Sequence, residues 1–237
     1  MLTQQAARSW ACGLFALAAL SLSVLSVSTS RSMREEAFPS YSSDLDEEVS
    51  RITAALALQP GASYAEVGGG NGLFFGAVAP HVLPNGHVYG TGATRAEVQA
   101  MREASIAAGI GNATEVYLAH THTSGLPPNC CDAILLRMVY HMLPHPIEYA
   151  ADFRRALRPG GRLLMLEHGA DNGVSTRLGA KLTVTFQGMT MNMNVVPPKA
   201  LIHELTPAGF EVIESFNKTV QAWPYFEEGY AILFGIP

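Results

Sequence analysis

The chain has 237 residues, of which 48% are hydrophobic and 15% are charged, enough for one large globular domain with a buried core. The formal net charge is −5, and lysine and arginine form no cluster, which argues against nucleic acid as a partner. The three cysteines are Cys12 and the adjacent pair Cys130 and Cys131. This sparse, odd set fits neither a disulfide framework nor a CxxC zinc site.

The first 30 residues differ in composition from the rest of the chain. Arg8 is their only charged side chain, and residues 9–30 contain none over a length that can cross a bilayer. We interpret residues 1–30 as a signal peptide, a membrane anchor or an organelle-targeting segment that lies outside the fold. A buried helix of the folded domain is the alternative. A polar linker at 31–43 follows.

From residue 44 onward, stretches typical of strands and of helices alternate. Helices are predicted at 44–58, 72–82, 94–108, 147–157 and 200–209, and strands at 63–67, 87–91, 115–119, 132–139, 162–168, 210–216 and 230–236. Such alternation predicts an α/β domain over 44–237, with a mostly parallel seven-stranded sheet and helices on both faces. The last two strands are close enough in sequence to pair, so an antiparallel C-terminal edge strand is expected.

A glycine-rich stretch, YAEVGGGNGLF, follows the first predicted strand. In an open α/β sheet this turn is a usual ligand site, and glycine lets the backbone approach a ligand closely. A phosphate-binding P-loop needs a lysine that is missing here, and the GxGxxG dinucleotide fingerprint needs a glycine where Leu73 stands. The pattern present is GxGxG, preceded by Glu66, and its glycines are Gly68, Gly70 and Gly72.

This pattern resembles motif I, (D/E)xGxGxG, of the class I S-adenosylmethionine-dependent methyltransferases. Two later stretches are also similar to that family: LRPGGRLLMLE (157–167) resembles its turn into the fifth strand, and AGFEVIES (208–215) its entry into the sixth. The resemblance covers about residues 44–237. It implies a Rossmann-like fold, S-adenosylmethionine as cofactor, and methyl transfer to a small-molecule or lipophilic acceptor.

The resemblance also implies cofactor contacts. Gly68, Gly70 and Gly72 would lie against the methionine moiety of the cofactor. Glu66 would support the glycine loop and the amino-acid end of the cofactor.

Two family positions depart from the pattern. Family members normally end the second strand with an acid that holds the ribose hydroxyls, and carry a second acid near the end of the third strand that faces the adenine amine. These positions are Gly92 and His120 here. Thr91 or Thr94 could bind the ribose instead, whereas Glu97 is better explained as the capping-box partner of Thr94.

Each lost contact to a charged group would weaken binding by roughly 1.5–3 kcal/mol without abolishing it. Two hypotheses therefore stay open: a working methyltransferase with altered contacts, and a catalytically inactive methyltransferase fold that serves as a binding protein. An NAD(P)-dependent reductase is opposed by Leu73 and by the missing ribose acid.

Candidates for the chemistry lie at the carboxyl ends of the fourth and fifth predicted strands, namely Arg137, Tyr140, His141, Glu167 and His168. The Tyr140-His141 pair resembles a stretch of some small-molecule methyltransferases. We predict Tyr140 and His141 as catalytic residues, with His141 as general base or acceptor-positioning group because imidazole titrates near neutral pH. A structural histidine that caps a helix or lies buried in hydrogen bonds is the alternative.

Two histidine pairs, His120-x-His122 and His141-x-x-x-His145, have metal-like spacings. Pro144 interrupts any helix that would align the second pair, and we identified no acidic ligand beside them in the sequence. No metal site is therefore predicted.

The segment 170–198 lies where this family varies its acceptor site, so a lid is predicted there. Its MTMNMN stretch alternates Met189, Met191 and Met193 with polar residues, as core packing or as a flexible wall over an apolar acceptor. Because export would separate the enzyme from a cytosolic cofactor, residues 9–30 predict location at a membrane or in an organelle rather than secretion or a periplasmic location.

Overall fold

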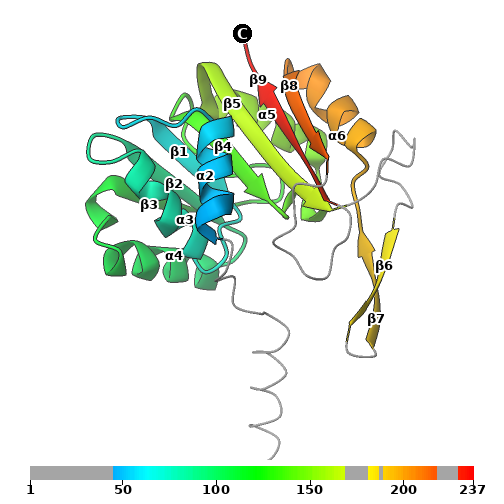
Figure 1. Ribbon diagram of the computed structural model, residues 1–237, viewed down its shortest axis with the longest axis horizontal. Coiled ribbons are helices and arrows are strands. Elements are labelled where there is room, and N and C mark those ends of the chain that lie inside the picture. The colour runs from blue at the N-terminus through cyan, green and yellow to red at the C-terminus, as the bar shows by residue number, and fades with distance from the viewer. Residues whose placement is uncertain (1–44, 169–180, 187–188, 218–228) are drawn as a thin grey trace, which may run out of the picture. The chain divides into compact units, whose positions relative to one another are not determined.

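The computed structural model describes residues 45–168, 181–186, 189–217 and 229–237 (Figure 1). The predicted targeting segment and linker, 1–30 and 31–43, lie outside the described residues and stay predictions. Among the residues that are described, no helix is both long and apolar enough to span a membrane.

A seven-stranded sheet with the order β3-β2-β1-β4-β5-β9-β8 forms the centre of the domain (Figure 1). Its strands are β1 (Ser63–Val67), β2 (His87–Gly92), β3 (Thr114–Leu118), β4 (Cys131–Arg137), β5 (Leu157–His168), β8 (Glu211–Asn217) and β9 (Gly229–Gly235). Strands β1 to β5 pair in parallel, and β9 is antiparallel to both β5 and β8. The predicted fold class is confirmed, with β8 rather than the antiparallel C-terminal strand β9 as the outermost strand.

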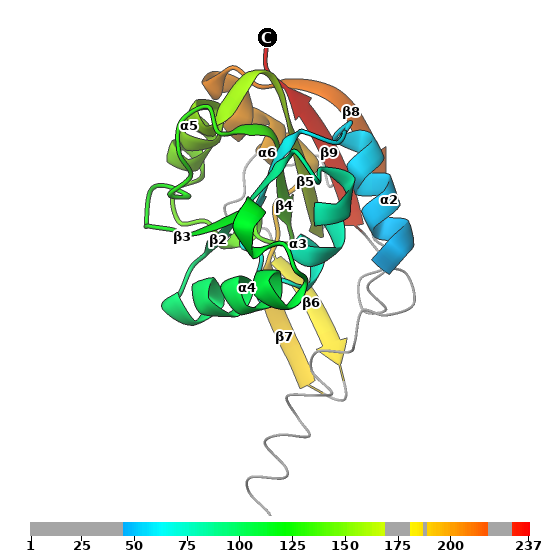
Figure 2. The ribbon, with the colours of Figure 1, turned by 90° about the vertical axis from the view of Figure 1, so that its left-hand side faces the viewer.

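Helices cover both faces of this sheet (Figure 2). They are α2 (Leu45–Ala55), α3 (Leu73–Val78), α4 (Arg95–Ala107), α5 (Pro146–Ala156) and α6 (Pro198–Leu205). Tyr64 of β1 packs in the core with α2, α3 and α4, whereas its neighbour Ala65 packs in the core with α5 and α6. Adjacent residues of a strand point to opposite faces of the sheet. Since both faces are covered, β1 is buried at every residue and shows no alternation of buried and exposed positions.

Two predicted helices end in a tighter turn than expected. The helix predicted at 72–82 is α3 followed by the 3-10 turn η1 (Ala79–His81), and that predicted at 200–209 is α6 followed by η4 (Thr206–Ala208). Each 3-10 turn contains a proline, which cannot donate the backbone hydrogen bond that would continue an α-helix.

The predicted lid segment contains an antiparallel hairpin, β6 (Lys181–Phe186) and β7 (Met189–Asn194), which forms a separate two-stranded sheet. The alternating MTMNMN stretch is β7, in agreement with its period of two. Residues 170–180 and 187–188 of the lid segment lie outside the described residues, and the lid stays a prediction.

A loop, not a helix, connects β3 to β4, and this loop is fixed to α5. Asp152 of α5 accepts hydrogen bonds of 2.8 Å from the Thr123 hydroxyl and the Ser124 N–H, and a further one from the Ser124 hydroxyl. The Tyr149 hydroxyl donates to the His120 carbonyl oxygen. Burial alone would raise the pKa of Asp152, but hydrogen bonds from Ser124, Arg155 and Thr123 outweigh it and lower the pKa.

We expect Asp152→Asn to lower the free energy of unfolding by roughly 1.5–3 kcal/mol at neutral pH, because the amide cannot accept all of these bonds. A carboxyl with a lowered folded-state pKa stabilises the fold above its unfolded pKa and loses that contribution as pH falls through the folded value. The difference between Asp152→Asn and the wild type should therefore shrink below about pH 4. Urea unfolding across pH measures it, with Asp46→Asn on the exposed side of α2 as the control. A pH-independent difference would contradict the assignment.

Candidate active site

The predicted site residues meet at one edge of the sheet. Glu66 and the glycines end and follow β1, Gly92 ends β2, His120 follows β3, and Tyr140 and His141 follow β4. These strands are parallel, so their carboxyl ends lie at the same edge. Strand order reverses between β1 and β4, which is the place where open α/β sheets bind ligands.

The glycine loop after β1 needs glycine for its backbone conformation. Gly68, Gly70 and Gly72 all have positive φ angles, of 74°, 54° and 80°, which side chains rarely adopt. The N–H groups of Gly68 and Gly69 donate to the Thr91 carbonyl oxygen at 2.9 and 3.2 Å, which ties the loop to β2. A Cβ at Gly68 would lie 2.6 Å from the Val139 side chain, whereas one at Gly70 would meet open space. The backbone at Gly70 is therefore accessible to a ligand.

Four glycines, among them Gly72 of the loop, make room for Met101 of α4. A Cβ at Gly69 or Gly90 would lie 2.7 or 3.0 Å from the Met101 sulfur, and one at Gly72 would lie 3.1 Å from the Met101 Cα. A Cβ at Gly92 would lie 3.2 Å from the Met101 methyl carbon. Met101 is fully buried. Four glycines thus permit the close approach of α4 to the ends of β1 and β2.

Gly92 replaces the expected ribose acid for a packing reason. A Cβ at this position would lie 2.9 Å from the Glu97 Cβ and 3.1 Å from the Val98 backbone nitrogen. Half of the predicted capping box forms: the Glu97 N–H donates to the Thr94 hydroxyl, while the Glu97 carboxylate accepts at 2.8 Å from the Ala93 N–H, one residue before the N-cap. The first turn of α4 therefore occupies the space of an acidic side chain at position 92.

Glu66 lies buried beneath the glycine loop. Its Oε2 would be 3.4 Å from a Cβ at Gly69, and this oxygen makes no hydrogen bond to the described residues. Burial is the main cause that raises the pKa of Glu66, to about 7. The Glu48 carboxylate adds to this rise, and the Arg137 guanidinium opposes it. An unpaired buried carboxyl is costly unless a ligand satisfies it. A cationic amino group that entered at this loop would do so.

His120 lies on the surface of the loop after β3. Its backbone N–H donates to the Thr123 carbonyl at 2.8 Å, and its carbonyl accepts from Tyr149. The main chain of His120 is therefore fixed and its side chain is exposed, and a contact to adenine stays a prediction.

His141 and Glu167 form a hydrogen-bonded pair between the ends of β4 and β5. His141 lies in the 3-10 turn η3 (Tyr140–Met142), and its Nδ1 is 2.9 Å from Oε2 of the fully buried Glu167. The His141 backbone N–H donates to Oε1 of the same carboxylate at 3.2 Å. A carboxylate has no proton to donate, so Nδ1 donates, and Nε2 is then the basic nitrogen of the neutral ring.

Tyr140 is a buried contact between η3 and α6. Its side chain is fully buried, and its hydroxyl donates to Oε2 of Glu204 at 2.9 Å. This bond fixes the turn that carries His141. A catalytic role for Tyr140 stays a prediction.

Arg137, named from the sequence as a candidate, is held in a structural ion pair. Its guanidinium donates two hydrogen bonds to Glu48 of α2, at 2.7 and 2.9 Å, and lies 5.2 Å from the centre of the Phe74 ring. This bidentate pair, mostly shielded from solvent, joins α2 to the end of β4 beneath the site. Cys130 and Cys131 are buried free thiols, in agreement with the small packed residues expected there.

Three partners at this edge could not be found from the sequence. Glu48, Met101 and Glu204 lie on helices, and each meets its strand-end neighbour only through tertiary packing. The sole sequence signal for Met101 is its place on the apolar face of the helix predicted at 94–108.

The fold and the site define the class of protein. A glycine loop at the switch point, an acid at the end of β1, and the strand order with an inserted antiparallel strand are those of S-adenosylmethionine-dependent methyltransferases. Residues 41–215 match the family model described as "Methyltransferase domain". The chain belongs to this family, which confirms the predicted family, the cofactor S-adenosylmethionine and methyl transfer as the class of reaction.

Solved structures share the fold at low sequence identity. A SAM-dependent methyltransferase from Aquifex aeolicus has a TM-score of 0.63 and 17% identity, covering 83% of this chain and 94% of that one. The [4+2]-cyclase SpnF has a TM-score of 0.63 and 15% identity, with 81% of each chain covered. Geranyl diphosphate methyltransferase in complex with SAM has a TM-score of 0.62 and 11% identity, covering 81% of this chain and 85% of that one.

A curated relative also matches part of the chain. It is an uncharacterized 37.1 kDa protein in transposon TN4556 of Streptomyces fradiae, 34% identical over 118 residues. The match spans 50% of this chain and 33% of that relative, so the chain matches about a third of the relative's length.

We expect Gly92→Asp not to restore a ribose contact. Both Gly92→Asp and Gly92→Ala should lower the free energy of unfolding by roughly 1–3 kcal/mol, because the added Cβ forces α4 away from β2. Gly76→Ala is the control, since its Cβ would lie 3.9 Å from its nearest neighbour in a helix. Denaturant unfolding and calorimetric titration with S-adenosylmethionine measure both effects. Tighter cofactor binding by Gly92→Asp at unchanged stability would show this account to be wrong.

Proposed function

We propose that the protein transfers the methyl group of S-adenosylmethionine to a small, apolar acceptor molecule. The observation that carries this proposal is the buried Glu66 carboxyl, one oxygen of which has no hydrogen-bond partner among the described residues, beneath a loop of three left-handed glycines. The carboxylate suits the ammonium of an amino-acid ligand, and the open backbone at Gly70 suits close approach. Both features fit the methionine end of the cofactor.

The ribose would find its acceptor on α4. The Glu97 carboxylate lies beside the Gly92 position, and a carboxylate that accepts one N–H keeps further acceptor capacity. The hydroxyl of Thr94 already caps α4, and the hydroxyl of Thr91 is buried under the glycine loop. We therefore assign the ribose-binding role to Glu97, which lies five residues after Gly92, the position of the usual acid.

The apolar character of the acceptor is supported by exposed side chains at the same edge. Leu73 follows the glycine loop, Met142 belongs to η3, and Ile147 opens α5, and all three are large and exposed. Exposed apolar groups that gather around a site typically contact an apolar ligand. The solved geranyl diphosphate methyltransferase, in complex with GPP and sinefungin at 12% identity and a TM-score of 0.61, is one protein of this fold whose named ligand combines an apolar chain with a charged diphosphate.

S-adenosylmethionine supplies an electrophilic methyl group on a sulfonium. An acceptor oxygen, nitrogen or thiol forms the new bond to carbon as the carbon–sulfur bond breaks, and its proton must leave. His141 would take this proton on Nε2, while the Glu167 carboxylate stabilises the imidazolium that forms. Fixing the acceptor beside the methyl group supplies the rest of the rate enhancement.

Glu66→Gln tests cofactor binding. An ammonium ligand favours the ionised carboxylate, so binding to the wild type should release a proton below pH 7, where Glu66 is largely protonated. Wild-type affinity should rise from about pH 6 to 7.5, and Glu66→Gln should remove this dependence and weaken binding by about 10- to 150-fold at pH 7.5. Titration calorimetry in two buffers of different ionisation enthalpy measures both. Unchanged affinity in Glu66→Gln would rule out this role.

His141→Gln tests the base. With acceptors that must lose a proton, we expect kcat to fall by about 10²- to 10⁴-fold, and with tertiary amines or thioethers to change little. His203→Gln on the exposed side of α6 is the control, and formation of S-adenosylhomocysteine is the readout. Equal losses for both acceptor classes would assign His141 to positioning instead. If the protein binds the cofactor but methylates none of a broad panel of acceptors, the result would favour the inactive binding protein. The absence of the two family acids at Gly92 and His120 is the sequence feature in favour of that alternative.

A further inference from the structure

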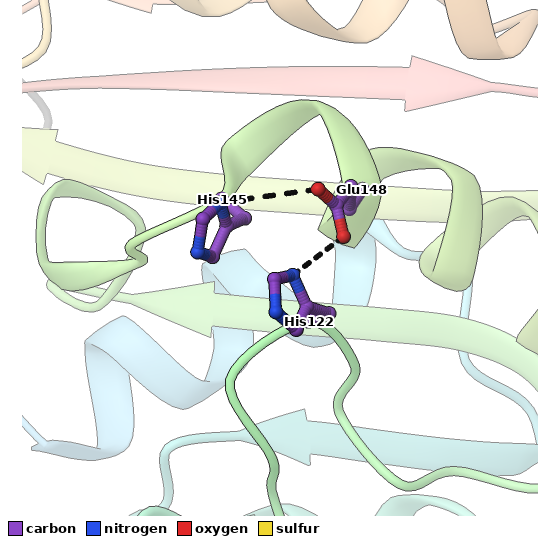
Figure 3. A group of neighbouring side chains, drawn as sticks. All are labelled: His122, His145 and Glu148. Atoms are coloured by element: carbon purple, nitrogen blue, oxygen red, sulfur yellow. Dashed lines mark ion pairs between the residues drawn. The ribbon is translucent and has the colours of Figure 1, made fainter.

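A cluster of two histidines and a glutamate lies on α5 and on the loop before β4, outside the residues assigned to methyl transfer. His122 belongs to the loop between β3 and β4, His145 precedes the first residue of α5, and Glu148 lies in its first turn (Figure 3). One candidate ligand atom from each residue lies within 4.8 Å of the other two. We propose that these three side chains bind a divalent transition metal ion, with Zn²⁺ as the best match.

The distances between the side chains fit a tetrahedral ion after small adjustments. Nδ1 of His122 is 2.6 Å from one carboxylate oxygen of Glu148, and Nδ1 of His145 is 3.8 Å from the other. Ligand atoms about 2.0–2.1 Å from a tetrahedral Zn²⁺ are roughly 3.4 Å apart. The two observed distances, each to a different oxygen of Glu148, lie on either side of this value, and one candidate atom from each residue lies within 4.8 Å of the others, so rotations of the exposed side chains would bring three atoms into place.

The two imidazole rings face each other, with centroids 4.1 Å apart and planes inclined by 28°. Two protonated rings at this separation would repel, whereas two neutral rings can each present a lone pair to one cation. The ordinary alternative is an exposed histidine–glutamate ion pair without a metal. A shared cation accounts for the convergence of both rings on one carboxylate, which a single ion pair does not require.

The backbone around the cluster is fixed before any metal arrives. His145 and Glu148 are three residues apart at the start of α5, so the helix sets their separation. His122 is flanked by anchored residues: the His120 carbonyl accepts from Tyr149, and Thr123 donates to Asp152. A metal ion would thus bridge two elements that already lie together.

The donor set selects the kind of ion. Two imidazole nitrogens and one carboxylate oxygen favour zinc, nickel or copper over magnesium and calcium, which prefer oxygen ligands. Three protein ligands leave a fourth position for water. The three side chains are about half exposed, so an ion can enter without any opening of the fold.

Neither histidine pair marked by spacing in the sequence, His120 with His122 or His141 with His145, forms this cluster. It takes His122 from one predicted pair and His145 from the other, because His141 lies in η3, apart from α5, and turns to Glu167. The acidic partner Glu148 follows His145 by only three residues, which contradicts the expectation that no acidic ligand lies close in the sequence. The prediction of no metal site is replaced by this proposal, which does not depend on the proposed methyl transfer.

Zinc titration of the full chain, stripped of metal by a chelator, tests the site. We expect one Zn²⁺ per chain by calorimetry, a rise in Tm on binding, and an affinity about tenfold or more weaker in His122→Ala, His145→Ala and Glu148→Gln. His81→Ala is the matched control, an exposed histidine in the crossover that returns to the opposite, amino-terminal edge of the sheet. Near-ultraviolet circular dichroism establishes that each variant is folded.

Co²⁺ supplies a second readout, because its visible spectrum reports tetrahedral coordination. We expect this spectrum in the wild type and in His81→Ala, and its loss in His122→Ala. A dissociation constant for Zn²⁺ weaker than about 100 µM would overturn the proposal. Equal zinc binding by the wild type and all three ligand variants would also overturn it, since the ion would then lie elsewhere, for example on the cysteines.

Discussion

The close approach of α4 to the ends of β1 and β2 governs the rest of the site. Met101 can be fully buried there only because Gly69, Gly72, Gly90 and Gly92 carry no Cβ. Dense packing of this kind tolerates little added volume. The same contact therefore explains two features that look unrelated in the sequence: glycines beyond those that positive φ angles demand, and glycine in place of an acid at the end of β2. A packing solution that removes one polar ligand contact places another carboxylate, that of Glu97, at the same strand end.

Two buried carboxyl groups at this edge, those of Glu167 and Glu66, differ in their hydrogen-bond partners. Glu167 is paired with His141 through both its oxygens, whereas one oxygen of Glu66 has no partner among the described residues. A paired carboxylate is part of the protein's own architecture, but an unpaired one destabilises the fold unless something outside the chain satisfies it. Burial raises the pKa of Glu66 to about 7. This rise reflects the same free-energy cost of a buried charge, because it means that the neutral form is favoured. Glu167 therefore orients His141, whereas one oxygen of Glu66 keeps its capacity to accept a hydrogen bond.

The order of strands and helices could be predicted from the sequence because it rests on local signals. Strand β1 is the predicted strand 63–67, α4 begins directly after its predicted cap Thr94, and the GxGxG pattern marks the glycine loop. The contacts that finish the site could not be predicted, since their partners come from distant elements. Glu48 reaches Arg137 across 89 residues and Glu204 reaches Tyr140 across 64, and no periodicity records either pairing. The histidines show the same limit: spacing along the chain marks two pairs, whereas the fold brings together one member of each, His122 and His145.

The loop between β3 and β4 connects the two sites proposed above. Its first residue after β3 bonds the Gly92 carbonyl through the Ala119 N–H, at 2.9 Å, and its next residue is His120. A few residues on, His122 meets Glu148 and Asp152 holds Thr123 and Ser124. In the absence of a helix between β3 and β4, these side-chain bonds to α5 take over the task of fixing the loop. An ion bound by His122, His145 and Glu148 would add a further link between the loop and α5 only two residues from His120. Such a link would lie beside the position at which the family resemblance predicts a contact to adenine, in a loop whose main chain is already held to α5 without the ion.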